Sequence, residues 1–95
     1  MTIRVLIERE VEPGQEMKLQ QLMMQLRSKA IHVKGYISGE TLRALDNPNR
    51  FLAISNWNSV EDWRNWEKSP ERQKLQEEIR KLLHGKESCT VYTRF

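Results

Sequence analysis

Cysteine is nearly absent from this 95-residue chain, in which Cys89 is the only one. A single cysteine excludes an internal disulfide and cannot form a zinc site by itself. The histidines, His32 and His84, are not spaced from other ligand residues in a metal-binding pattern. Glycine-rich phosphate-binding loops are missing as well, so nothing indicates a nucleotide or a flavin. We therefore expect no metal, no cofactor and a reducing compartment, the cytoplasm.

The chain also lacks long hydrophobic runs and blocks of one charge. Its first residues, MTIRVLIERE, carry charges inside every apolar stretch, which predicts neither a signal peptide nor a membrane-spanning segment. The 16 Lys and Arg residues are interspersed with 13 Asp and Glu residues, for a net charge of +3. Nucleic-acid-binding surfaces usually cluster their basic residues, so we predict a solvated surface without a nucleic-acid partner.

The length is that of one domain, residues 1–95. Alternating or apolar segments bounded by turn residues predict four strands, at 2–10, 36–44, 51–57 and 90–95. Apolar residues spaced three and four apart predict a helix that reaches Val33 before Gly35, and another from Pro70 to His84 before Gly85. Between them a short helix begins after Ser59, which with Asp62 has the spacing of a capping box.

The order of strand, helix, hairpin, two helices and strand predicts an α+β fold of the split βαβ type. Such a fold has a four-stranded antiparallel sheet with its helices on one face. The strands carry apolar residues on both faces; Leu52 and Ile54, for example, point away from Phe51 and Ala53. Because a domain this small cannot cover the second face itself, we predict that a second copy packs on it as a homodimer.

All three tryptophans lie within residues 56–72. Trp57 closes a strand, whereas Trp63 and Trp66 are three residues apart and so lie on one helix face. Such a pair either anchors the helix to the sheet as part of the core or forms the wall of a pocket for a flat aromatic ligand. Trp66 is the better candidate for a pocket wall, and both interpretations stay open at this point.

Few polar residues are candidates for chemistry. His32, close to Tyr36 at the start of the hairpin, is a candidate base, although the dipole of the preceding helix also explains a histidine there. Asn56 ends a strand just before the tryptophan helix; its amide is able to orient a phenol or carbonyl oxygen, or it simply belongs to the turn. Cys89 is a poor candidate nucleophile because neither histidine is near it in sequence.

Three stretches of the chain match one known family: Gly35–Leu42, Asp46–Arg50 and Trp57–Pro70. The most specific part is the pattern W-x-S-x-x-x-W-x-x-W-x-x-S, which runs from Trp57 to Ser69. On these residues, nearly the whole chain resembles the antibiotic biosynthesis monooxygenase (ABM) domain. The resemblance implies a dimeric ferredoxin-like fold in which the sheets of two copies pack face to face.

The same resemblance implies several possible activities, because the family includes cofactor-independent oxygenases of phenols or quinols, haem-degrading enzymes and small proteins without an established reaction. The haem-degrading branch pairs a tryptophan that matches Trp66 with an iron-binding histidine ten residues later, where this chain has Gln76. That branch also uses an asparagine in the first strand, at a position that matches Glu8. We therefore expect no haem degradation.

The expected function is that of a cofactor-independent monooxygenase acting on a small quinol or phenol. The resemblance suggests that Trp66 stacks on the substrate, with Trp63 and Tyr36 beside it. His32 as base and Asn56 as orienting group are inferred from their chemistry and not from a family motif. The alternative is a non-catalytic dimeric module that binds a small ligand or assists a pathway or stress response, with the tryptophans as core.

Overall fold

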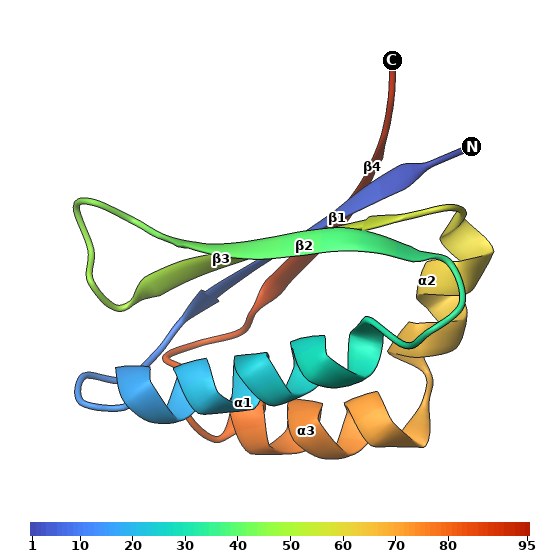
Figure 1. Cartoon of the computed structure of the whole chain (residues 1–95). Coiled ribbons are helices and arrows are strands. Elements are labelled where there is room, and N and C mark those ends of the chain that lie inside the picture. Colours follow the sequence, from blue (N-terminus) through green and yellow to red (C-terminus); the bar gives the residue numbers. More distant parts are fainter.

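The protein has two layers, a sheet and a set of helices that cover one of its faces (Figure 1). The computed structural model describes residues 1–95. Its strands are β1 (Ile3–Glu10), β2 (Tyr36–Arg43), β3 (Arg50–Trp57) and β4 (Ser88–Thr93), and its helices are α1 (Glu16–Ala30), α2 (Val60–Glu67) and α3 (Pro70–Arg80). The strands are antiparallel in the order β2-β3-β1-β4. The predicted ferredoxin-like α+β fold is therefore confirmed.

Strict alternation along β1 determines which face of the sheet meets the helices. Ile3, Val5 and Ile7 are buried beneath the helices, while Arg4 and Glu8 are exposed on the opposite side. The register of β1 with β3 extends this inner face, because each of these apolar residues lies opposite an inner-face residue of β3: Trp57, Ser55 and Ala53. The alternation read from the sequence thus fixes the core face of the sheet.

The β2–β3 hairpin has the predicted extent, and Gly39 within it marks a close approach. A Cβ atom on Gly39 would lie 2.7 Å from the hydroxyl oxygen of Tyr36. The register shifts nearby, between Tyr36 and Ser38. Tyr36 can therefore fold over the inner face of β2, where its ring meets Trp57 edge-on with the centroids 5.3 Å apart.

Helix α1 ends at Ala30, earlier than the sequence predicts. The N–H groups of His32 and Val33 bond to carbonyls three residues back, so the chain leaves the helix through tight turns before it reaches Gly35. Gly35 has a φ of 89°, and a Cβ there would lie 2.2 Å from Asp62 Oδ2. This glycine does not cap α1 but allows the α1–β2 connection to lie against α2.

Helix α3 also ends before the predicted residue, at Arg80. Leu82 and Leu83 again donate to carbonyls three residues back, and the N–H of His84 donates to the carbonyl of Glu10 at 2.7 Å. Strand β4 begins at Ser88, two residues before the predicted start, because Ser88 and Cys89 pair with Glu8 and Ile7. The bond between His84 and Glu10 and the pairing of Ser88 and Cys89 with β1 are tertiary contacts, so they leave no local sequence pattern.

The starts of α2 and α3 agree with the sequence. Ser59 Oγ accepts the N–H of Asp62 at 3.1 Å, and Ser69 Oγ accepts the N–H of Arg72 at 3.2 Å. Pro70 is the first residue of α3. Each serine satisfies a free N–H of the first helical turn, which is worth about 1 kcal/mol per helix. The two caps fix where α2 and α3 begin, and so where Trp66 lies.

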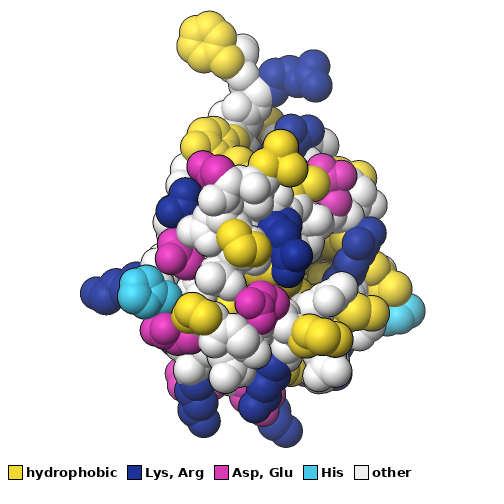
Figure 2. Space-filling view, turned by 90° about the vertical axis from the view of Figure 1, so that its left-hand side faces the viewer, with side chains coloured by type: hydrophobic (Ala, Val, Ile, Leu, Met, Phe, Trp, Pro, Cys, Tyr) yellow, Lys and Arg dark blue, Asp and Glu magenta, His cyan; other side chains and the backbone are white.

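The outer face of the sheet carries no helix: α1 and α3 lie side by side on the other face, with α2 at one end (Figure 1). Five apolar side chains point outward from the four strands according to the strand register: Leu6, Leu42, Leu52, Ile54 and Tyr92. Tyr92 is 52% exposed and Leu42 47%. The view onto the end of the molecule shows basic and acidic side chains mixed with scattered hydrophobic ones (Figure 2). We call the five apolar residues the outer patch.

Candidate functional site

A cavity of about 90 Å³ lies between the inner face of the sheet and the helices. All three tryptophans border it, together with Tyr36 of β2. Arg27 of α1 and Thr41 of β2, both exposed, border it too, so the cavity reaches the surface between these two elements. A surface hollow of about 430 Å³ adjoins it there and shares Met23, Arg27 and Thr41. The site is narrow inside and wide at its mouth.

The three tryptophans are as buried as core residues, with exposed fractions of 1% for Trp57, 2% for Trp63 and 5% for Trp66. The rings of Trp57 and Trp63 lie at an angle, with their centroids 5.8 Å apart. Trp57 Nε1 donates to Ser55 Oγ at 3.0 Å, whereas Trp63 Nε1 is buried without an acceptor. The tryptophans therefore belong to the core and at the same time form the wall of the cavity.

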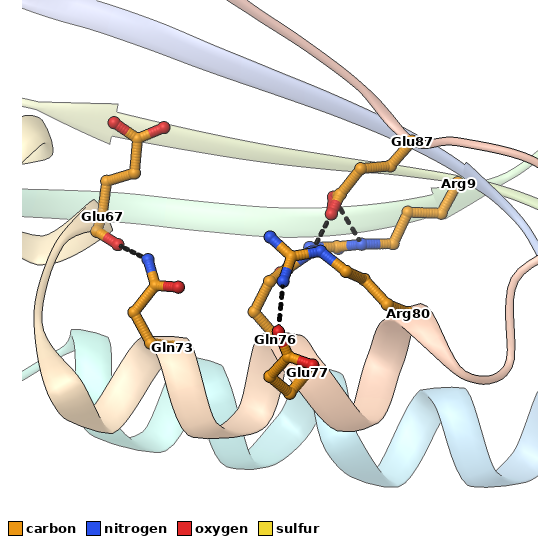
Figure 3. A network of polar contacts seen from close by, with 7 residues as sticks. All are labelled: Arg9, Glu67, Gln73, Gln76, Glu77, Arg80 and Glu87. Atoms are coloured by element: carbon orange, nitrogen blue, oxygen red, sulfur yellow. Dashed lines mark hydrogen bonds and ion pairs between the residues drawn. The ribbon is translucent and has the colours of Figure 1, made fainter.

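A buried polar network lies between β1, α3 and the residue that precedes β4 (Figure 3), and its Arg9 also borders the cavity. Arg9 is 3% exposed; its Nη2 donates to Gln76 Oε1 at 3.3 Å, and its Nε lies 3.2 Å from Glu87 Oε2. The Nε–H does not point at that oxygen and finds no other acceptor. Gln76 Nε2 donates to the other carboxylate oxygen of Glu87. Arg9 is thus paired with Glu87, but its hydrogen bonds are incomplete.

Arg72 is a second buried arginine at the cavity, on the first turn of α3. It is 7% exposed, and its guanidinium lies over the ring of Trp63, 5.1 Å from the ring centroid. Burial lowers the pKa of Arg72, and the carboxylates of Glu87 and Glu67 oppose that shift. Burial likewise lowers the pKa of Arg9, against the effect of Glu87 and together with the charge of Arg72. The lining of the cavity therefore contains these two cations as well as aromatic rings.

The structure brings together three of the five residues predicted for the site. Trp63, Trp66 and Tyr36 all border the cavity. His32 is exposed in the turn after α1 and does not border it. Asn56 points to the outer face, where its Oδ1 accepts from Arg4 and its Nδ2 donates to Ser38 Oγ, both at 3.0 Å. The geometry therefore lends no support to the catalytic roles predicted for His32 and Asn56.

Of the two positions that argue against haem degradation, only Gln76 lies near the cavity. Its amide is 1% exposed and is bound by Arg9 and Glu87, so it is part of the polar network. Glu8 lies on the outer face of the sheet, away from the cavity, so it has no bearing on what the cavity binds. The inner-face residues of β1 closest to that position are Ile7 and Arg9, and neither offers an amide.

The burial of Arg9 and Arg72 was not predicted, because charged side chains are usually exposed to solvent. A sequence signal existed for both. Arg9 continues the inner-face alternation of Ile3, Val5 and Ile7, and Arg72 precedes Leu75, Gln76 and Ile79 at the spacing of one helix face. An arginine that shares the periodicity of buried residues points inward unless the chain bends.

Two further groups bear on the possible chemistry. Cys89 lies on the inner-face register of β4 opposite Ile7, and partial burial of its thiol raises the pKa, with Glu67 adding to that shift. It is therefore a weak nucleophile at neutral pH, as expected from the sequence. No three His, Cys, Asp or Glu side chains lie close enough together to hold a metal ion, and no helix is long and apolar enough to cross a membrane.

The fold and the cavity define a small α+β domain with an aromatic pocket between its sheet and its helices. The family model for antibiotic biosynthesis monooxygenase matches residues 2–78, and the chain belongs to this family. The match covers β1 through nearly all of α3, and it includes every residue proposed above for the cavity wall.

Solved structures resemble the fold closely at low sequence identity. A conserved protein of Methanosarcina mazei has a TM-score of 0.95 at 17% identity, over 100% of this chain and 94% of that one. SnoaB, a cofactor-independent oxygenase of Streptomyces nogalater, has a TM-score of 0.90 at 15% identity, over 99% and 93%. A Mycobacterium tuberculosis protein has a TM-score of 0.91 at 15% identity, over 100% and 96%. No curated protein sequence matches this chain.

Proposed function

We propose that this protein is a cofactor-independent monooxygenase that oxidises a small quinol or phenol. The observation that carries the proposal is the aromatic cavity of Trp63, Trp66 and Tyr36 in a chain of the ABM family. SnoaB, described as a cofactor-independent oxygenase, has the same fold. In such a reaction the substrate supplies the electrons: one oxygen atom of O₂ enters the organic product and the other leaves as water.

The substrate ring would stack on Trp66 and lie between Trp63 and Tyr36. A cavity of about 150 Å³ is needed to hold one benzene ring, and the inner cavity has about 90 Å³. The ligand therefore displaces side chains at the mouth, where the neighbouring hollow of about 430 Å³ gives room. His32 and Asn56 lie outside this cavity, so the proposal assigns them no part in the chemistry.

Oxygen uptake with a panel of monocyclic quinols and phenols tests the proposal directly. We expect uptake by the purified protein without added cofactor and an unchanged rate in His32→Ala. In Trp66→Phe we expect a rate loss of up to about tenfold, because the smaller ring weakens a stacking contact worth about 0.5–1.5 kcal/mol. Circular dichroism shows whether each variant is folded. If the whole panel gives no uptake, or if Trp66→Phe is as fast as the unchanged protein, the proposal fails.

The alternative function is a non-catalytic module that binds a small ligand or assists a pathway. The small inner volume and the absence of a histidine from the lining favour it. On this alternative Trp66 serves mainly as core, and Trp66→Ala lowers stability by about 3–5 kcal/mol while no substrate is turned over. Ligand binding without any oxygen uptake is the result that selects this alternative.

We propose in addition that the protein works as a homodimer in which a second copy covers the outer patch. The single free cysteine also fits a reducing compartment, which for this proposal is the cytoplasm. Basic and acidic side chains are mixed on the surface that Figure 2 presents, so the proposal includes no nucleic-acid partner and no membrane partner.

A further inference from the structure

The charge of Arg72 is not balanced by any direct partner in the chain. Its guanidinium forms no ion pair and no hydrogen bond, and its one close polar or aromatic contact is the ring of Trp63. An arginine side chain carries five N–H donors and remains charged in proteins. The Arg72 side chain is 7% exposed, but its guanidinium nitrogens, unlike Nε of Arg9, are not sealed off, so an anion can still approach them.

The two carboxylates that act on Arg72 are already engaged elsewhere. Glu87 Oε2 lies 3.2 Å from Arg9 Nε, and Glu87 Oε1 accepts from Gln76. Glu67 Oε1 accepts from Arg64 Nη1 at 3.2 Å. Two largely buried arginines therefore share the partly buried carboxylate of Glu87, and the excess positive charge lies at the edge of the aromatic cavity.

A second donor without an acceptor lies beside Arg72. Trp63 is 2% exposed, borders the cavity and carries its Nε1–H buried without a partner. Leaving such a donor unsatisfied costs about 1–3 kcal/mol. The Nε1 atom is closed off from the cavity in this structure, so a bound oxygen reaches it only after the indole shifts, whereas Arg72, whose guanidinium is stacked on the same indole, borders the cavity directly.

We infer that the cavity binds its aromatic ligand as an oxyanion, a phenolate or an aromatic carboxylate, with the oxygen against the Arg72 guanidinium and the ring against Trp66. This inference rests on the proposed function and specifies its substrate class. It also explains how a phenol could lose its proton in a cavity that has no histidine in its lining. A fixed positive charge lowers the pKa of a bound phenol, so the reactive phenolate forms without a histidine base.

The probe for the test is 4-nitrophenol, because its phenolate is coloured and its phenol form is not. Binding is measured without oxygen and without turnover, by titrating the protein into the probe at a series of pH values. An opposite charge within about 4–6 Å lowers a pKa by about 1–3 units. We expect the bound probe to ionise at least about one pH unit lower than the free probe.

Two substitutions of Arg72 and one control isolate the charge. We expect Arg72→Gln to abolish the downward shift and Arg72→Lys to retain most of it. Arg80→Gln is the control, since Arg80 lies on the same helix but is exposed and paired with Glu77. It should behave as the unchanged protein. Thermal unfolding shows whether each variant is folded, and the lysine variant keeps the test valid if the glutamine variant is not.

Several charged groups lie around Arg72: Arg9, Glu67, Arg80 and Glu87, with Cys89. Burial raises the pKa of the Cys89 thiol. Arg27 and Glu40 stand at the edge of the cavity, and both histidines are exposed and border no part of it. Because these groups are the same in the unchanged protein and in the Arg72 variants, comparing the variants over one pH series separates the ionisation of the ligand from that of the protein.

A second pair of ligands separates the two oxyanions. Benzoate and benzyl alcohol have similar size, and only benzoate is charged. Tighter binding of benzoate, lost in Arg72→Gln, extends the site to carboxylates; binding of nitrophenolate alone restricts it to phenolates. The inference is overturned if no probe binds, if nitrophenol binds with an unshifted pKa, or if Arg72→Gln leaves the shift in place. If oxygen uptake is still observed after such a result, the oxyanion inference is rejected and the proposed function is retained.

Discussion

Arg9 occupies a position where the alternation of β1 calls for an apolar side chain. Its charge is tolerated because Glu87 pairs with it and Gln76 bridges the two (Figure 3). This network joins β1 to α3 and to the residue that precedes β4. Without the carboxylate, a guanidinium that is 3% exposed would remain buried and unpaired.

We predict that Glu87→Gln destabilises the protein by about 3 kcal/mol, because breaking a buried ion pair leaves one charge uncompensated. Urea unfolding followed by tryptophan fluorescence measures this change. Glu77→Gln is the matched control; its partner Arg80 is exposed, and exposed pairs contribute at most about 1 kcal/mol. Equal effects of the two substitutions would show that burial does not strengthen the Arg9–Glu87 pair.

Cys89 is an exposed residue whose thiol is nonetheless partly shielded from water at the β4 register. Burial and, to a smaller degree, Glu67 raise the pKa of its thiol. We predict that iodoacetamide alkylation of the folded chain rises at a higher pH than alkylation of the urea-unfolded chain. The sign also applies to stability: the protonated thiol's contribution is complete below the unfolded pKa and is lost as pH rises through the folded one. Cys89→Ser removes this loss, which the denaturation midpoint measures.

At the level of whole elements, the connection between α1 and β2 depends on Gly35. It combines a positive φ with the close approach of Asp62 of α2, whose Cβ would be 2.4 Å from an added Cβ. Gly85 has a similar φ of 81° but open space around it. The two glycines therefore differ in packing and not in backbone conformation, which makes one a control for the other.

We predict that Gly85→Ala costs about 1–2 kcal/mol, the price of an L-residue in the left-handed region. Gly35→Ala should cost clearly more, because α2 has to move away and Trp63 moves with it. Thermal unfolding of both variants gives the comparison, and near-ultraviolet circular dichroism reports the tryptophan environment. If both variants lose the same stability, the close approach of Asp62 to Gly35 does not contribute to the cost of the substitution.

Element types and order could be predicted from the sequence, because alternation, helical spacing and capping residues such as Ser59 and Ser69 are local signals. Element ends could not always be predicted. Helix α1 gives way to tight turns after Ala30, before the glycine that the sequence predicts as its cap, and β4 starts at Ser88 because this residue pairs with β1. The aromatic wall was foreseeable from the tryptophan spacing, whereas the cations at the cavity required the packed structure to show which arginines are buried.

At the level of the whole molecule, one face of the sheet is left without a covering layer by the chain itself. The outer patch contributes side chains from all four strands and adjoins charged residues such as Arg4 and Glu8. Apolar side chains from every strand on one open face are typical of an interface between copies, since a sheet of this size buries a second face best against an identical one.

We predict that the unchanged protein at micromolar concentration has twice the chain mass of 11.4 kDa in light scattering. Ile54→Lys, at the centre of the outer patch, should produce a monomer, because a dimer would bury two lysines without partners. Met17→Lys is the control: Met17 is 71% exposed on α1, which lies on the other face of the sheet, so it should leave the dimer intact. A stable monomer of the unchanged protein would contradict the proposed dimer, and the outer patch would then need a partner other than a second copy.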